Sequence, residues 1–298
     1  MLNDKVLKNI YGFFELSDKP SETELQDYYK NKYYQESKST YSRSYSNEEI
    51  IYFNNKLEQK YHILIEQGIL DATNKRFLDI GCGEGWGLSF FQKRGWNVKG
   101  LDHSVHGCKT HNPEMLKFLD EGDPIQSLKR LGSEGQRYDV LWLDNVLEHL
   151  IDPLGMLEYC LALLSNEGLL VIEVPNDFSV VQKELLSNGN VKEPFWIVSP
   201  DHISYFNNDG LIELCKTAGL TCVDMISDYA IDFDLFNSYS NYKIKPEVGK
   251  ESHNARLKVE NLLHNISIEK TNKLYRLYAE MGIGRQITGF FKRSEKAV

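Results

Sequence analysis

The chain has 298 residues and a formal net charge of -9, from 34 Lys and Arg against 43 Asp and Glu. Phosphate binding depends on clustered Lys and Arg, and no long basic run occurs, so this balance argues against a nucleic-acid partner. With 41% hydrophobic and 26% charged residues, the composition is that of a globular protein that buries a core.

The N-terminal sequence MLNDKVLKNIYGFFEL is not typical of a secretory signal, because it contains Asp4 and no apolar run followed by small residues. No uninterrupted apolar stretch approaches about 18 residues, so we predict no membrane insertion. Five scattered cysteines without a Cys-x-x-Cys pair argue against a disulfide framework and a structural zinc site. We therefore expect a soluble, cytoplasmic protein with reduced thiols.

Residues 1–74 are polar and rich in tyrosine, and we expect them to form a helical cap. Two Ser-x-x-Glu sequences, beginning at Ser21 and Ser46, fit the capping box that starts a helix. After the second of them, apolar residues recur at helical spacing: Ile50, Phe53, Leu57, Tyr61 and Leu64. No β pattern is visible in this part of the chain.

After Asn74, short apolar runs alternate with helical stretches. The predicted strands are RFLDI, NVKGLD, YDVLWLD, GLLVIEVP, TCVDMI and QITGFF. Strands that alternate with helices at this spacing imply parallel pairing through crossover helices, hence a doubly wound α/β sheet. We expect this core over residues 75–235, a helical insertion over 236–282, and a final strand and tail over 283–298.

The strand RFLDI leads directly into Gly81, Gly83 and Gly85, followed by an amphipathic helix. Glycines let the backbone turn sharply and approach a ligand where a Cβ would collide, and the helix start adds N–H groups. A dinucleotide fingerprint requires a third glycine at the position of Trp86, and no Gly-Lys-Ser/Thr ending is present. The cluster therefore predicts a ligand-binding turn but disfavours a pyrophosphate.

Carboxylates surround this turn. Asp102 ends the next strand, about 20 residues after the first glycine, where a carboxylate can accept hydrogen bonds from the hydroxyls of an adenosine ribose. Asp79 and Glu84 add two negative charges, which suit a ligand carrying an ammonium and a sulfonium better than a pyrophosphate. These residues favour a cationic nucleoside.

Together, LDIGCGEGWG, YDVLWLDNVLEHLIDPLGML and GLLVIEVPND resemble successive motifs of class I S-adenosylmethionine-dependent methyltransferases, over about residues 75–228. SPDHISYFNNDGLIELCKTAGL and GIGRQITGFFKR resemble the methyltransferases of bacterial surface-glycan and nucleotide-sugar gene clusters. The resemblance implies a Rossmann-like, mostly parallel seven-stranded sheet, S-adenosylmethionine across its strand ends, and a lid built from the N-terminal helices and the late insertion. It also implies cofactor contacts: the methionine part to Gly81, Gly83 and Gly85, the ribose to Asp102, the adenine amine to Asp123, and the donor flank to Asn145.

Further contacts are predicted around this cofactor. Arg43 lies in a tyrosine-rich stretch and would clamp the cofactor carboxylate, since its planar fork suits carboxylates. Tyr34 and Tyr205 are candidate acceptor contacts, although ordinary packing explains most tyrosines of the first region. Asn176 and Asp177 follow a strand on the expected ligand side and are candidates too, with a turn and helix cap as the alternative.

Methyl transfer requires donor and acceptor to be held collinear, which can be worth roughly 7 to 11 kcal/mol. A base is needed only where the acceptor has a proton that water does not take. His202 and His149 are the candidate bases. The alternatives are a helix cap or a pair with Asp201 for His202, and a structural pair under the cofactor for His149. Beyond Asp102, we recognise no set of metal ligands around His103 and His106 in the sequence, so we predict no metal.

The predicted function is methyl transfer from S-adenosylmethionine to a hydroxyl, or an amine, of a small-molecule sugar substrate such as a nucleotide sugar or glycan precursor. The alternatives are methylation of a non-sugar metabolite such as a quinone or polyketide, an NAD-dependent sugar epimerase or dehydrogenase, and a cofactor-binding pseudoenzyme. The sequence leaves open whether the insertion covers the active site or contacts a second subunit in a homodimer.

Overall fold

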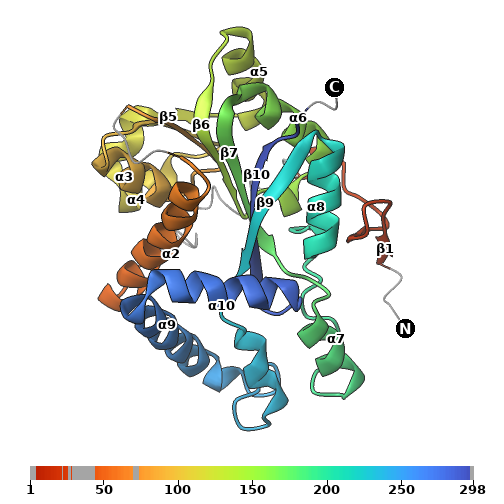
Figure 1. Cartoon of the computed structure of the whole chain (residues 1–298). Helices are drawn as coiled ribbons and strands as arrows, with labels where there is room; N and C mark the ends of the chain where they lie inside the picture. The colour runs from red at the N-terminus through yellow and green to blue at the C-terminus, as the bar shows by residue number, and fades with distance from the viewer. Residues whose placement is uncertain (1–4, 22, 26–27, 29–43, 70–73, 296–298) are drawn as a thin grey trace.

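The central feature of the computed structural model is a seven-stranded sheet in the order β5-β4-β3-β6-β7-β10-β9 (Figure 1). The structure describes residues 5–21, 23–25, 28, 44–69 and 74–295. The sheet strands are β3 (Arg76–Ile80), β4 (Asn97–Asp102), β5 (Leu119–Glu121), β6 (Tyr138–Asp144), β7 (Leu164–Pro175), β9 (Leu220–Ser227) and β10 (Gln286–Arg293). The pairs from β5 to β7 are parallel, and β10 runs antiparallel to both β7 and β9. The prediction of a mostly parallel, doubly wound, seven-stranded sheet is confirmed.

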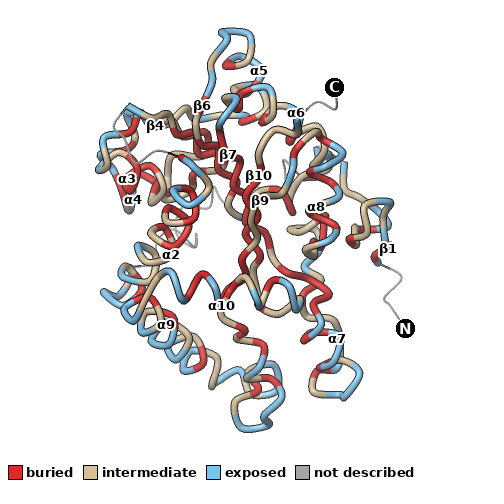
Figure 2. The backbone as a smooth tube through the Cα atoms, viewed as in Figure 1, coloured by how far each residue is buried: buried red, intermediate tan, exposed pale blue. Residues whose placement is uncertain are grey.

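Helices cover both faces of this sheet, and most residues of β3, β6 and β7 are buried whichever face they point to. Alternate residues of β6 enter different hydrophobic clusters. Leu141 and Leu143 lie with residues of the helices after β5 and β6 and of the helix before β9, whereas Val140 and Trp142 lie with residues of the helix before β3, the helix after β3 and the last helix before β10. Figure 2 shows the resulting buried strands between more exposed helices. The crossover helices are α3 (Trp86–Lys93), α4 (His106–His111), α5 (Pro124–Ser133), α6 (Pro153–Leu163), α7 (Val180–Ser187) and α8 (Asn208–Thr217). Short 3-10 helices are η2 (Pro113–Phe118), η3 (Leu147–His149), η4 (Ile231–Phe236) and η5 (Pro246–Val248).

Local sequence explains where the helices begin. The side chain of Asp152 accepts a hydrogen bond from the Gly155 N–H, and Pro153 is the first residue of α6. Ser46 and Glu49 form the reciprocal capping box predicted at the start of α2 (Asn47–Glu66). A capping box satisfies two of the N–H groups that a helix start leaves without partners.

The prediction that residues 1–74 contain only helices is wrong. Two short strands, β1 (Val6–Lys8) and β2 (Phe14–Leu16), form an antiparallel hairpin, and β2 also pairs with β8 (Ser204–Tyr205). Each of these strands has only two or three residues, too few for an alternating pattern to stand out. The pairing with β8 joins segments that are far apart in sequence, so the local sequence of β2 does not reveal the partner that stabilises it.

The insertion before β10 is helical, as predicted. It consists mainly of α9 (Gly249–Ile266) and α10 (Ile268–Glu280), which lie beside α2 (Figure 1). The Asn55 side chain of α2 donates to Asn261 of α9 at 2.9 Å, and Asn272 of α10 donates to the Gln59 carbonyl at 3.2 Å. The insertion and the N-terminal helix α2 therefore form one continuous helical layer.

Among the described residues, we find no helix that combines the length and the apolar character needed to span a bilayer.

The buried ammonium group of Lys60 links α2 to the carboxyl ends of the central strands β6 and β7. Lys60 is 2% exposed, and its Nζ lies 2.8 Å from Asp144 Oδ2 and 3.0 Å from Glu173 Oε2. Burial lowers the pKa of Lys60, but the two carboxylates raise it more, and the net shift is upward. Burial raises the pKa of Glu173, yet Lys60 and Lys56 outweigh it and bring this pKa to about 2. The Thr288 hydroxyl also donates to Glu173, at 2.6 Å.

We expect Lys60→Met to destabilise the protein by about 3–5 kcal/mol, because it removes the buried counter-ion of the buried carboxylate Glu173. The matched control is Lys273→Met, which breaks an exposed pair with Glu269 and costs at most about 1 kcal/mol. Urea unfolding of both variants measures the difference. Adding Glu173→Gln to Lys60→Met recovers part of the loss, and equal losses in the two single variants would contradict the role of Lys60.

Candidate functional site

The glycine turn follows β3 and crosses the carboxyl edge of the sheet. Gly81, Gly83 and Gly85 have φ angles of 74°, 50° and 76°, in the region that favours glycine. The Gly81 N–H donates to the Leu101 carbonyl at 2.7 Å, which holds the turn against β4. A Cβ added to Gly81 would lie 2.5 Å from Cγ2 of Val146. The turn therefore lies directly against the segment that follows β6.

Asp102 joins the turn to the end of β4. Its Oδ2 accepts the Gly83 N–H at 2.8 Å, and its Oδ1 accepts the Ser104 N–H at 3.0 Å. Burial raises the pKa of Asp102, and the two backbone bonds act against this shift. An ionised carboxylate has about four lone-pair positions, so both oxygens keep acceptor capacity for hydroxyl groups. The predicted contact with a ribose stays a prediction.

Asp79 is buried below the start of α3. Its Oδ2 would lie 2.7 Å from a Cβ added to Gly87, which places the carboxyl group against the first turn of that helix. Burial, together with the nearby Asp144 and Asp102, raises the pKa of Asp79 to about 8. The carboxyl group is therefore largely protonated at pH 7, and a cationic ligand beside it would favour the ionised form.

Glu84 supports the turn from outside. Its Oε1 accepts the Tyr45 hydroxyl at 2.8 Å, and its Oε2 accepts the Trp86 indole N–H at 2.7 Å. His111 Nε2 lies 3.4 Å from Oε1. These contacts connect the chain before α2 to the turn. From the sequence, Glu84 is expected only as a negative charge near the ligand, and this structural role is not predicted.

Two further cofactor candidates lie at strand ends. Asp123 is exposed, and its side chain caps α5 by accepting the Ile125 N–H at 2.9 Å. Asn145 follows β6 with φ 53°, and its side chain donates to Asp144 Oδ1 at 2.8 Å. Their contacts with adenine and with the donor stay predictions. Arg43 and Tyr34 lie outside the described residues.

The structure brings the two candidate catalytic histidines together. His149 lies in η3, directly after β6, and His202 precedes β8. The Ile203 N–H donates to the Glu148 carbonyl at 2.8 Å, which holds the loop of His202 against η3. The two imidazole centroids are 4.9 Å apart, with the ring planes at 83°. These residues are distant in sequence, so spacing alone could not show the pair.

The proton position on neutral His149 follows from its neighbour. Its Nδ1 lies 2.6 Å from the Asp201 backbone carbonyl, which can only accept a hydrogen bond. Nδ1 therefore carries the hydrogen, and Nε2 presents its lone pair. This Nε2 lies 3.8 Å from Glu148 Oε1.

Glu148 is 1% exposed, and neither carboxylate oxygen accepts a hydrogen bond from another described residue. Burial raises its pKa well above the ordinary value, and the nearby Asp177, Asp144 and Glu173 add to this shift. A buried carboxyl group of this kind is costly unless it is protonated or a cation compensates it. In the sequence, the only signal for this group was the Glu148-His149 pair shortly after the strand that ends at Asp144.

The remaining acceptor candidates are engaged inside the protein. Asn176 is buried, and its amide donates to the carbonyls of Gly282 and Gly284 at 3.4 and 3.1 Å. The Tyr205 side chain is buried, and its hydroxyl donates to the His202 carbonyl at 2.9 Å. These contacts favour structural roles that hold β10 and the His202 loop in place.

Asp177 is also buried. Burial raises its pKa to about 7, although the nearby Arg285 acts in the opposite direction. Its contact with an acceptor stays a prediction.

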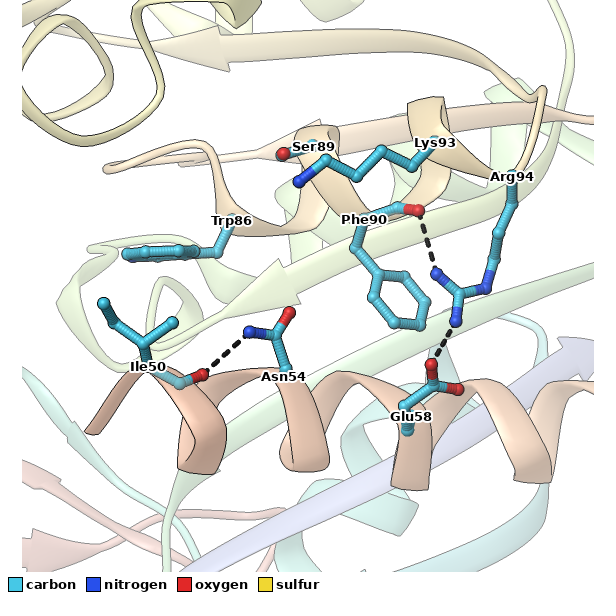
Figure 3. A pocket seen from close by; sticks show the side chains of 8 residues that line it. All are labelled: Ile50, Asn54, Glu58, Trp86, Ser89, Phe90, Lys93 and Arg94. Carbon is cyan, nitrogen blue, oxygen red and sulfur yellow. Dashed lines mark hydrogen bonds and ion pairs between the residues drawn. The ribbon is translucent and has the colours of Figure 1, made fainter. Parts of the chain in front are cut away.

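A separate groove lies between α2 and α3 (Figure 3). It is lined by Ile50, Asn54, Glu58, Trp86, Ser89, Phe90, Lys93 and Arg94. The Arg94 guanidinium pairs with Glu58 and donates to the Phe90 carbonyl. The lining residues belong to α2 and α3 or directly follow α3. None of them is a glycine of the turn, His149 or His202.

The sequence model of a family described as "Methyltransferase domain" matches residues 53–225. Among curated proteins, the chain is similar to a ubiquinone biosynthesis O-methyltransferase of Coxiella burnetii, with 27% identity over 57% of this chain and 72% of that protein. It is also similar to the enzyme of the same name from Colwellia psychrerythraea, with 27% identity over 55% of this chain and 69% of that protein.

The chain is also similar to solved structures. One is a SAM-dependent methyltransferase from Archaeoglobus fulgidus, with 21% identity, a TM-score of 0.49, and coverage of 80% of this chain and 94% of that chain. Another is a sarcosine dimethylglycine methyltransferase from Galdieria sulphuraria, described there as putative, with 18% identity, a TM-score of 0.49, and coverage of 81% and 85%.

We expect Gly81→Ala to weaken donor binding by about tenfold or more, because the new Cβ meets Val146 and the left-handed φ is strained. Gly189→Ala is a matched control, with φ 75° and no atom within 4 Å of the added Cβ. It should cost stability without changing donor affinity. Calorimetric titration with the donor measures both variants, and equal affinities would contradict the importance of the close approach.

We expect the stability of the ligand-free protein to be less pH-dependent in Asp79→Asn. A folded-state pKa of about 8 against an ordinary 3.8 means that the folded state binds more protons between these values. The Asp79 contribution therefore makes wild-type stability fall as pH rises from about 4 to 8, by up to about 1.4 kcal/mol per pH unit. Urea unfolding at pH 5 and pH 8 gives the comparison, and identical pH dependences would contradict this environment.

Proposed function

Since this chain belongs to the class I S-adenosylmethionine-dependent methyltransferases, we propose that it transfers the methyl group of that cofactor to a hydroxyl group of a small acceptor molecule. The observation that supports a hydroxyl acceptor is the pair of His149 and His202 beside Glu148. The pair lies on the segment after β6 and on the loop before β8. Val146 of the first segment contacts the glycine turn, so the pair and the donor turn border the same region.

For this reaction the protein mainly has to position the donor and the acceptor and to assist removal of the hydroxyl proton. The acceptor oxygen attacks the methyl carbon in line with the carbon–sulfur bond, whose electron pair returns to sulfur. Collinear placement supplies most of the acceleration, and help with the hydroxyl proton adds about 10²- to 10⁴-fold. Imidazole groups suit that help near neutral pH.

For the acceptor class, we favour a quinone precursor or a related hydroxylated metabolite. The support is the name of the relatives, ubiquinone biosynthesis O-methyltransferase, at 25–27% identity. A nucleotide sugar or glycan precursor is the second candidate. Its support is the resemblance of SPDHISYF and GIGRQITGFF to glycan-cluster methyltransferases.

The test is incubation of the purified chain with labelled S-adenosylmethionine and two acceptor panels, hydroxylated aromatic compounds and nucleotide-linked sugars. We expect label and one added methyl group on an oxygen of the aromatic panel. Transfer only to the sugars would replace the favoured acceptor class. Transfer only to nitrogen or carbon would contradict hydroxyl methylation.

We expect His202→Gln and His149→Gln each to lower turnover by about 10²-fold or more, because each removes a group that assists loss of the hydroxyl proton. Donor affinity should remain near wild type in both. His62→Gln is the control, since His62 lies on α2 and pairs with Glu66 at its surface. Turnover with the active acceptor and donor titration distinguish the roles, and unchanged turnover in both variants would leave positioning alone as the mechanism.

A further inference from the structure

We propose that Glu148, His149 and His202 bind one divalent transition-metal ion, of the Zn²⁺ or Mn²⁺ type, at the acceptor side of the site. The second part of the proposal rests on the proposed function: the ion binds the acceptor hydroxyl and promotes loss of its proton, so that His149 and His202 assist proton removal as ligands of the ion. The expectation of no metal rested on the cysteine spacing and on His103 and His106. The present group is assembled from two distant segments, so sequence spacing does not display it.

The three side chains converge. Each offers one ligand atom, and these atoms lie within 4.8 Å of one another. Nε2 of His149 and Oε1 of Glu148 are 3.8 Å apart, too far for a hydrogen bond between them. Ligand atoms at 2.0–2.2 Å from a tetrahedral ion are about 3.4 Å apart. Small side-chain movements would therefore close the group around an ion.

His149 is oriented as a metal ligand. Its Nδ1–H donates to the Asp201 carbonyl at 2.6 Å, which directs the Nε2 lone pair toward Glu148. A metal-bound histidine commonly donates its other ring N–H to a carbonyl or carboxylate, which fixes the tautomer and the ring orientation. This contact is an observation independent of the convergence of the three ligands.

Glu148 supplies the second independent observation. Its carboxylate is 1% exposed and accepts no hydrogen bond from another described residue. Asp144, Glu173 and Asp177 also disfavour additional negative charge at this position. A bound cation compensates both the burial and the neighbouring carboxylates, and Coulomb attraction is strong in such a poorly solvated region.

The ligand types select the class of ion. Two imidazole nitrogens and one carboxylate oxygen suit Zn²⁺, Mn²⁺ or related first-row ions better than Mg²⁺ or Ca²⁺, which prefer oxygen ligands. Three protein ligands leave at least one position open, as in catalytic zinc sites. The open position is where an acceptor hydroxyl would bind.

The proposed step balances without a redox partner. The ion lowers the pKa of the bound hydroxyl, and its proton leaves to water. The resulting oxygen anion attacks the methyl carbon while the carbon–sulfur bond breaks toward sulfur. The products are the methyl ether, the neutral thioether of the demethylated cofactor and one proton in solution.

Binding is tested on the untagged full-length chain after chelator treatment and dialysis, by calorimetric titration with ZnCl₂ and, separately, with MnCl₂. We expect about one ion per chain, with affinity at least about tenfold weaker in Glu148→Gln and in His202→Gln. His62→Gln, which alters a histidine–glutamate pair outside the site, should bind as the wild type does. Absence of saturable binding, or equal affinity in all four proteins, would overturn the site.

Two further measurements keep the result interpretable. Thermal unfolding in chelator should show Glu148→Gln folded, and a metal-induced rise in midpoint should occur in the wild type and be lost in the variant. A Co²⁺ spectrum without thiolate charge-transfer bands should show nitrogen and oxygen ligands, whereas thiolate bands would place the ion at a cysteine and overturn the site.

Transfer assays separate the two parts of the proposal. If the protein binds the ion at this group and still methylates the hydroxyl at an unchanged rate in chelator, the catalytic part of the proposal is overturned and the proposed function stands. Stoichiometric binding without hydroxyl methylation supports the site and overturns the proposed function.

Discussion

The absence of a side chain at Gly81 is the constraint on which the site depends. A Cβ there would lie 2.5 Å from Val146 Cγ2, so the turn after β3 can lie against the segment after β6 only with glycine. Asp102 reinforces the turn through the Gly83 N–H. The same close approach brings the donor turn near η3, which contains Glu148 and His149. The proposed donor and acceptor regions therefore share this one contact.

Around this contact the protein concentrates negative charge where a cationic donor is used. Asp79, Asp144 and Glu173 are close enough to influence one another's ionisation, and Lys60 compensates two of them from α2. Burial raises the pKa of Asp79 and Asp144, whereas at Glu173 the nearby lysines outweigh burial and lower the pKa, so the protonation of these groups depends on which cations are present. A methyl donor with an ammonium and a sulfonium fits this balance better than an anionic dinucleotide.

Apart from the three-residue strand β5, which was too short to be recognised, local pattern and spacing were sufficient to predict the other six strands of the sheet, the glycine turn, the helix caps at Ser46 and Asp152, and the helical insertion. These features depend on neighbours in sequence, where propensity, capping and periodicity act. The pairing of β2 with β8, the engagement of Glu84 by Tyr45, and the convergence of Glu148 with His202 were not predictable in this way. Each depends on residues that only the complete fold brings together, and neither β2 nor β8 exceeds three residues.

The pairing of β2 with β8 links the beginning of the chain to the loop of His202. The Leu16 N–H donates to the Ile203 carbonyl at 2.9 Å, and Phe13 packs so closely on Gly210 that a Cβ there would lie 2.8 Å from it. During synthesis, β2 leaves the ribosome long before its partner strand exists, and contacts of such sequence separation form slowly. The proposed acceptor side is therefore expected to fold only after the sheet's first five strands have been translated, whereas the glycine turn can form as soon as β4 and β6 are available.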